Sequence, residues 1–305
     1  MERGPATARI HGEGILMRLA RGERQLIVTA DDFGLSPSVN EAVERAASVG
    51  VLSAASLMVG APAAAQAVAL ARRLPQLKIG LHLVLTDGWA VLRPGEIPDL
   101  VGCDGRFSHG MVRDSFRCLL DARVRGQLAA EIGAQYRAFA ATGLELDHVN
   151  THKHFHFHPL VLDMILDIGR EFGLAAVRLP AEPLWFAARQ GAAASVSTVF
   201  LSPWVHLMRA TLRRASLAHN DHVFGISCSG RLDEDTLAFI LGNLPPGSSE
   251  IYLHPATSPG QAPGARAGPE EELRALLSAR VRAALRASGA QRGGFGDLTR
   301  RARGS

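Results

Sequence analysis

Cysteines, aromatic residues and long apolar runs are all scarce in this chain of 305 residues. The three cysteines, Cys103, Cys118 and Cys228, are odd in number and widely spaced, and none belongs to a Cys-x-x-Cys pair. This spacing indicates neither a disulfide framework nor a thiolate zinc site, and it fits a reducing cytosol. No stretch approaches the roughly 20 apolar residues of a membrane-spanning helix, and residues 1–24 lack the continuous apolar middle of a signal peptide. We therefore expect a cytoplasmic protein.

An excess of charge of one sign is also lacking. The 33 lysines and arginines face 29 acidic residues, which gives a formal net charge of +4. Many of the arginines lie near the two ends of the chain or between residues 209 and 214. Such a small and dispersed excess is a weak argument for a polyanionic partner, so we expect no binding of nucleic acid.

From residue 25 onward the chain alternates between strand-like and helix-like patterns. About seven βα units without a repeat motif predict an α/β fold, a (β/α) barrel that is distorted or incomplete. A doubly wound open sheet is the alternative. We expect a single domain over residues 25–288, with flexible termini at 1–24 and 289–305. The expected strands are 25–30, 54–59, 78–82, 146–151, 175–179, 223–227 and 250–253.

Helices are expected between these strands. The sequence Ser38-Val39-Asn40-Glu41 is typical of a capping box that opens a helix ending near Gly50. The residues Leu128, Ile132, Tyr136 and Phe139 share the 3.6-residue period of one helix face. Residues 84–115 are an irregular segment, and so long an excursion is usually functional or disordered. The other expected helices are 62–74, 159–173, 234–241 and 270–287.

Polar residues follow the predicted strands at one end. The residues concerned are Asp31, Asp32, His82, His152, Arg178 and His254. Active sites of barrels are assembled at this C-terminal end of the strands. A carboxylate with imidazoles from separate strand ends suits a divalent metal with an open coordination position. Each residue also has an ordinary explanation, such as a helix-capping Asp or a partly buried His, so the prediction depends on the whole set.

Histidine recurs at every second position in Thr151-His152-Lys153-His154-Phe155-His156-Phe157-His158-Pro159. In an extended strand end this period of two would place His152, His154 and His156 on one side, as a metal site requires. The alternative is a polar loop without a specific ligand.

Five segments, taken in order, resemble the motifs of the YdjC-like carbohydrate deacetylases. They are Ala30-Asp31-Asp32-Phe33-Gly34, Ser53-Ala54-Ala55-Ser56-Leu57-Met58-Val59, Gly80-Leu81-His82-Leu83, the histidine run and Leu253-His254-Pro255. The resemblance covers about residues 25–256. It implies metal-dependent removal of N-acetyl from an amino sugar on a barrel-like fold. Family members often have Asp-Ser-His-His-His where this chain has Asn150-Thr151-His152-Lys153-His154. This departure, with the long histidine run and Val177-Arg178-Leu179-Pro180-Ala181-Glu182-Pro183, resembles the hopanoid-biosynthesis-associated HpnK branch.

The resemblance implies one divalent metal ion, Mg or Zn, as the cofactor. Asp32, His82 and His152 are the expected ligands, and they leave a position open for water. The choice of His152 over His154 stays open. The ligand set allows both metals, and two imidazoles favour a transition metal slightly.

Amide hydrolysis also needs groups that move protons. Asp31 is the candidate general base beside the metal, and Arg178 would keep it ionised and oriented. His254 is placed to protonate the departing amine. His154 and His156 remain candidates for substrate contacts or for support of the ligands.

Residues 183–214 combine apolar side chains with arginines. Two of the three tryptophans, Trp185 and Trp204, lie here beside Arg209, Arg213 and Arg214. An interfacial amphipathic segment and a buried cover over the barrel mouth are equally consistent with this pattern. With the resemblance, this segment predicts a lipid-linked N-acetylated amino sugar as the substrate, with the lipid against Trp185, Phe200 and Trp204. It also predicts peripheral contact with the cytoplasmic membrane. A soluble chitooligosaccharide deacetylase and a non-catalytic binding protein are the alternatives, and a homodimer is compatible with each.

Overall fold

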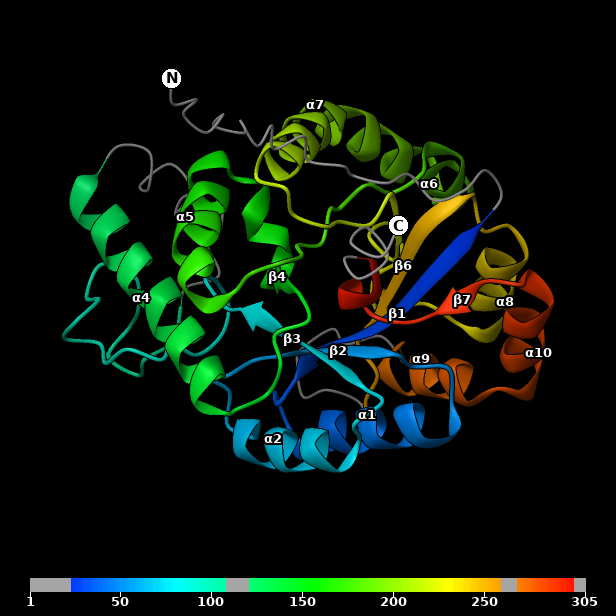
Figure 1. Cartoon of the computed structure of the whole chain (residues 1–305), viewed down its shortest axis with the longest axis horizontal. Helices are drawn as coiled ribbons and strands as arrows, with labels where there is room; N and C mark the ends of the chain where they lie inside the picture. The colour runs from blue at the N-terminus through cyan, green and yellow to red at the C-terminus, as the bar shows by residue number, and fades with distance from the viewer. Residues whose placement is uncertain (1–22, 108–120, 259–267, 299–305) are drawn as a thin grey trace, which may run out of the picture.

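The computed structural model describes residues 23–107, 121–258 and 268–298. These residues form a seven-stranded sheet in the order β4-β3-β2-β1-β6-β5, with β7 paired to β1. Every strand pairing in it is parallel. The sheet curls into a half-barrel with helices around it (Figure 1), which confirms the predicted α/β barrel class and excludes the doubly wound alternative. The strands are β1 Arg24–Phe33, β2 Ala54–Leu57, β3 Lys78–Leu83, β4 Val149–Thr151, β5 His222–Phe224, β6 Gly247–Leu253 and β7 Gln291–Arg292.

The gap between the edge strands β4 and β5 is bridged by an extended segment at residues 175–181. Val177 pairs with Val149 of β4, and Ala176 pairs with Ala218, in isolated parallel bridges. The Asn220 side chain accepts from the backbone N–H of Leu179 at 2.8 Å and donates to its carbonyl at 2.7 Å. The strand expected at 175–179 is therefore present only as bridged extended backbone, and this is the distortion of the barrel.

Helices surround the sheet on several sides. In Figure 1, α1, α2 and α9 lie along one side of the curled sheet, α4 and α5 along another, and α6 and α7 along a third. No helix in the described part of the chain is long and apolar enough to cross a bilayer. The helices are α1 Pro37–Val49, α2 Ala64–Arg73, α4 Ala122–Ala141, α5 Pro159–Gly169, α6 Leu184–Gln190, α7 Ala192–Arg214, α8 Glu234–Gly242, α9 Gly268–Leu277 and α10 Ala279–Ser288, with 3-10 turns η1 His152–Phe157 and η2 Arg170–Phe172.

Two helix predictions are corrected. Ser36, not Ser38, caps α1, because its hydroxyl accepts from the Val39 N–H. The helix expected over 270–287 is two helices, since Ser278 stops α9 and its side chain caps the first N–H groups of α10.

Helix α4 has two buried faces, one apolar and one polar. The predicted apolar face is buried. A second buried face is polar, and it holds part of the irregular segment after β3. Glu131 accepts from the backbone N–H groups of Val91 and Leu92, and Gln135 bonds both backbone groups of Val84. This part of the excursion is therefore fixed on the barrel, while residues 108–115 of the expected segment lie outside the described residues.

The chain continues into the fold after α10. β7 pairs with β1, and the Phe295 side chain is fully buried. The backbone N–H groups of Phe295 and Gly296 both donate to the carboxylate of Asp147. Residues beyond the expected boundary at 288 therefore contribute strand pairing and core packing. The expectation of flexible ends over 1–22 and 299–305 lies outside the described residues.

Candidate metal and catalytic site

A β-bulge at the end of β1 turns two adjacent aspartates toward the same site. Neighbouring residues of a regular strand point to opposite faces. Between Ala30 and Phe33 the register with β2 shifts, and Asp32 has φ 61°. Asp tolerates this left-handed conformation better than most residues, and bulges commonly redirect side chains beside active sites. The bulge explains how Asp31 and Asp32 can both serve one centre.

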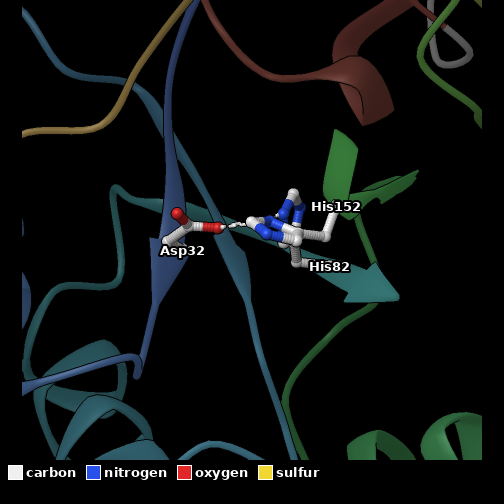
Figure 2. A group of neighbouring side chains, drawn as sticks. All are labelled: Asp32, His82 and His152. Carbon is white, nitrogen blue, oxygen red and sulfur yellow. Dashed lines mark hydrogen bonds and ion pairs between the residues drawn. The ribbon is translucent and has the colours of Figure 1, made fainter. Parts of the chain in front are cut away.

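Three candidate metal ligands lie close together at the C-terminal ends of β1, β3 and β4. They are Asp32, His82 and His152, and they are called the metal group below. Asp32 Oδ1 lies 3.2 Å from His82 Nε2 and 3.2 Å from His152 Nδ1. The ligand atoms of the three residues all lie within 4.8 Å of one another. Figure 2 shows Asp32 on its strand facing the two imidazoles, which approach from the opposite side. The sequence predicted this set, and the structure brings all three together.

The hydrogen bonds of His82 fix which ring nitrogen could bind a metal. Asn150 donates through Nδ2 to the carboxylate of Asp31 at 3.1 Å, so its Oδ1 faces His82 Nδ1 at 2.6 Å and must accept there. His82 therefore carries its proton on Nδ1, and Nε2 offers a lone pair. That buried Nε2 makes no hydrogen bond. A ligand histidine with its other nitrogen bonded to a side-chain oxygen is the usual arrangement in metal sites, so the donor set fits a divalent ion.

The charges of the group also suit a cation. Burial raises the pKa of Asp32, but the charge and the hydrogen bond of His152 outweigh it and hold that pKa well below its usual range. Burial lowers the pKa of His152, but the Asp32 carboxylate more than offsets this and leaves it raised. The carboxylate is thus ionised and attracts positive charge, which a proton on His152 or a metal ion can supply.

The histidine run is a turn and not a strand end. β4 ends at Thr151, and residues 152–157 form η1, in which Lys153 and His154 have φ 54° and 56°. The predicted alternation is therefore wrong, because two left-handed residues break the period of two. Of the run, His152 alone joins the metal group. The irregular segment reaches this turn through an ion pair between Asp87 and Lys153.

His156 is part of the framework. Its side chain is 1 % exposed. Nδ1 lies 2.5 Å from the Thr151 hydroxyl, and Nε2 lies 3.1 Å from the backbone carbonyl of Arg178. Burial lowers the pKa of this ring to about 3, so it stays neutral. Both ring nitrogens have a partner, and one of them is the backbone carbonyl of Arg178. The two predicted roles of His156, a substrate contact or support of the ligands, stay predictions.

Arg178 connects two buried carboxylates beside the metal group. It donates to Asp31 at 2.5 and 2.9 Å and to Glu250 at 2.8 and 2.7 Å. Arg178 and Glu250 have no exposed surface, and Asp31 is 2 % exposed. Burial raises the pKa of Asp31, but the Arg178 guanidinium outweighs it and holds the pKa well below its usual range. Asp31 is therefore an ionised carboxylate next to Asp32, oriented by Arg178, and its role as the general base stays a prediction.

Sequence reasoning missed Glu250 and Tyr252. With His254, they occupy alternate positions at the end of β6, which predicts a common face. The Arg178 guanidinium lies 4.7 Å from the centre of the Tyr252 ring, and the ring of His254 meets that of Tyr252 edge-on. The pKa of Tyr252 is raised well above its usual range, mainly by burial, so the phenol stays protonated. The Glu-x-Tyr-x-His spacing at the end of a buried strand could have predicted that these three side chains face the site together.

His154 and His254 both border this site. His154 Nε2 lies 3.1 Å from the Tyr252 hydroxyl, and burial lowers the pKa of that imidazole well below its usual range. The backbone N–H of His254 donates to Glu272 at 2.6 Å, which anchors the residue just past β6. Its imidazole is close enough to Asp31 and Asp32 to help lower the pKa of both.

Trp185 and Trp204, the two tryptophans predicted to contact the substrate, lie on α6 and α7. Trp185 packs against Phe186, Phe224 and Phe239 and is 44 % exposed. Trp204 belongs to an exposed stripe of α7, defined by Val196, Val199, Phe200, Trp204 and Leu207. The opposite face of α7 buries Met208 and Leu212, and the helix contacts η1. The stripe therefore faces outward on a helix beside the site.

Known proteins resemble this chain in sequence. A carbohydrate deacetylase from Brevibacillus brevis is 38% identical over 156 residues, which is 51% of this chain and 59% of that protein. A carbohydrate deacetylase from Thermoanaerobacter pseudethanolicus is 27% identical over 233 residues, which is 76% of this chain and 81% of that protein. The matched part of the chain thus spans about three fifths of the length of the Brevibacillus relative.

The fold has a counterpart among solved structures. A protein from Enterococcus faecalis V583 described as a cellobiose-phosphate cleavage protein superposes with a TM-score of 0.73 and 23% identity, over 91% of this chain and 99% of that one. The profile of the family described as YdjC-like protein matches residues 25–287, and the matched span contains the metal group, Arg178 and His254. The chain belongs to the YdjC-like protein family.

Proposed function

We propose that this protein removes the N-acetyl group from an amino sugar by metal-dependent hydrolysis, within one domain that spans residues 25–298. The observation that carries the proposal is a group of three candidate ligands, Asp32, His82 and His152, beside a separate ionised carboxylate, Asp31. A protein that only binds a metal needs the first and has no use for the second. The names of the sequence relatives, carbohydrate deacetylases, support the same reaction class.

A divalent ion, Zn or Mg, held by the three ligands would polarise the acetyl carbonyl and make water more acidic. The chain supplies the remaining steps. Asp31 accepts a proton from the attacking water, and Arg178 keeps that carboxylate pointed at the site. His254, on the β6 side, donates a proton to the departing amine. His154 and Tyr252 border the site as a linked pair of polar groups and are candidates for holding the sugar.

The test is release of acetate. Purified protein reconstituted with zinc or magnesium should release acetate from N-acetylglucosaminyl substrates, and stripping the metal with a chelator should lower the rate by at least about a thousandfold, because polarisation by a metal contributes several kcal/mol to the transition state. Acetate would be measured by a coupled assay, with re-addition of metal as the control. A protein that binds the sugar stoichiometrically without releasing acetate would establish the non-catalytic alternative.

We further propose that the sugar is attached to a lipid, of the hopanoid class that the resemblance in sequence indicates, and that the stripe of α7 rests against the cytoplasmic membrane. Phe200 is 75 % exposed and Val196 is 68 % exposed, on a helix that buries Met208 and Leu212. The last turn of α7 carries Arg213 and Arg214. An apolar stripe with arginines at its end matches an interface of acyl chains and anionic headgroups. The alternative substrate is a soluble chitooligosaccharide.

A double variant, Phe200→Ser with Trp204→Ser, separates these substrates. Each exposed ring that is buried in a lipid contributes at least about 1.5 kcal/mol, so binding to anionic vesicles should weaken about a hundredfold. Turnover of a lipid-linked substrate should fall with it, while turnover of a short soluble sugar should stay unchanged. Val49→Ser is the matched control, because Val49 is 65 % exposed but lies on α1. Equal loss on both substrates, or dissociation of a homodimer without any change in vesicle binding, would contradict the membrane assignment.

A further inference from the structure

Ser56 is a further side chain that contacts Asp31, the proposed general base. It is fully buried on β2, and its Oγ lies 3.1 Å from Asp31 Oδ1. The same Oγ lies 3.1 Å from His148 Nε2 and accepts from Asn150 Nδ2 at 2.8 Å. A hydroxyl has one hydrogen to donate. Asn150 donates to Oγ, and Ser56 donates its one hydrogen to Asp31 Oδ1. With His148 Nε2 as the third partner, Oγ is held by three groups.

His148 is held as firmly as Ser56. Its side chain has no exposed surface, and Nδ1 lies 3.0 Å from Asp147 Oδ2. Several donors outweigh burial and lower the pKa of Asp147, so the carboxylate is ionised and accepts from Nδ1–H. The imidazole occupies the space that a side chain at residue 80 would need, because a Cβ at Gly80 would lie 2.4 Å from Cε1 of His148. The packing against Gly80 and the bond to Asp147 together fix the ring so that Nε2 faces Ser56.

The end of the described chain closes this network. Phe295 covers the His148 ring with centroids 4.6 Å apart. The N–H groups of Phe295 and Gly296 donate to Asp147 at 3.0 and 2.8 Å. β7 attaches this segment to β1, the strand that carries Asp31. A continuous set of contacts therefore runs from Phe295 through Asp147, His148 and Ser56 to Asp31.

We propose that Ser56 is a positioning residue for the Asp31 carboxylate, and that Asp147 acts on catalysis through His148 and Ser56. Arg178 donates to both oxygens of Asp31 and also to Glu250. Arg178 alone therefore holds the Asp31 carboxylate from one direction. Ser56 and Asn150 both contact Oδ1 and supply the second direction. A base fixed from two sides stays in line with the water it deprotonates. The inference rests on the proposed deacetylation.

The test compares Ser56→Ala, Asp147→Asn and the double variant in the metal-loaded full-length protein. Ser56→Ala should lower kcat about tenfold to a hundredfold, the scale of losing one hydrogen bond to a charged group. KM and bound metal should stay at wild-type levels, because Ser56 contacts neither the metal ligands nor the proposed sugar side. Asp147→Asn preserves side-chain size and should lower kcat about fivefold. The double variant should be no slower than Ser56→Ala, since both substitutions act on one path.

Ser53→Ala is the matched control. Ser53 is a buried serine next to β2 whose hydroxyl bonds only the backbone of Val28, so kcat should be unchanged. Wild-type kcat in Ser56→Ala, or an additive double variant, would overturn the inference while leaving the deacetylase assignment intact. Absence of acetate release by the wild type would overturn both. If Ser56→Ala is too unstable to assay, the kcat of Asp147→Asn decides alone, and a value equal to wild type would overturn the inference.

Discussion

His82→Ala should leave the protein without stoichiometric metal and lower acetate release by at least about a thousandfold. Asn150 accepts from Nδ1–H of His82. The buried Nε2 of the same ring therefore keeps its lone pair for a metal. A site with three protein ligands has little redundancy, so loss of one releases the ion. Metal content would be measured by mass spectrometry after dialysis, together with turnover. Asp32→Ala and His152→Ala should behave in the same way.

Asp31→Asn is the matched control for these variants. It lies one residue from Asp32, but its carboxylate bonds Arg178 and not the metal group. It should keep its metal and still lose about a hundredfold or more in turnover, which is the usual scale of general-base catalysis. His154→Ala tests the ligand choice that the sequence leaves open. Retained metal in all three ligand variants, or lost metal in His154→Ala alone, would show that the ion binds elsewhere.

The positions of the strand ends could be predicted from the sequence because apolar runs and polar residues meet there. Asp31, Asp32 and His82 lie in the last residues of buried strands, and parallel strands bring their C-terminal ends to one edge. Backbone conformation within a turn could not be predicted in this way. The His152–Phe157 turn contains two non-glycine residues with positive φ, a conformation that hydrophobic periodicity does not encode.

The polar interior of the barrel was missed for a related reason. Ser56, His148, Asn150 and Glu250 lie in segments that read as apolar strands, where a lone polar residue is normally a packing detail. Their partners are distant in sequence, as with Arg178 and Glu250, which are 72 residues apart. Such pairings depend on the strand order β3-β2-β1-β6, which one sequence does not supply. The alternation of Glu250, Tyr252 and His254 along β6 was the one pattern in the sequence that could have predicted polar side chains on the inner face of the sheet.

Arg178→Met should lower the free energy of unfolding by about 3–5 kcal/mol, the usual cost of removing one partner from a buried ion pair. Arg178 has no exposed surface and is the shared partner of Asp31 and Glu250. Without it, two carboxylates remain in the barrel interior with hydrogen bonds from Thr29, Ser56 and Asn150 but without a counter-charge from this position. Urea unfolding at neutral pH would measure the loss, with ΔG extrapolated to water.

Two further variants identify charge as the cause. Arg178→Met with Glu250→Gln should be more stable than Arg178→Met alone, because one of the two uncompensated carboxylates is gone. Arg178→Lys keeps the charge but cannot donate to both carboxylates with a planar fork, so it should fall between wild type and Arg178→Met. Arg93→Met is the control, because Arg93 makes an exposed ion pair with Glu96, and it should leave unfolding unchanged. If the double variant is no more stable than Arg178→Met, the loss comes from packing, and the buried charges do not depend on Arg178 for their compensation.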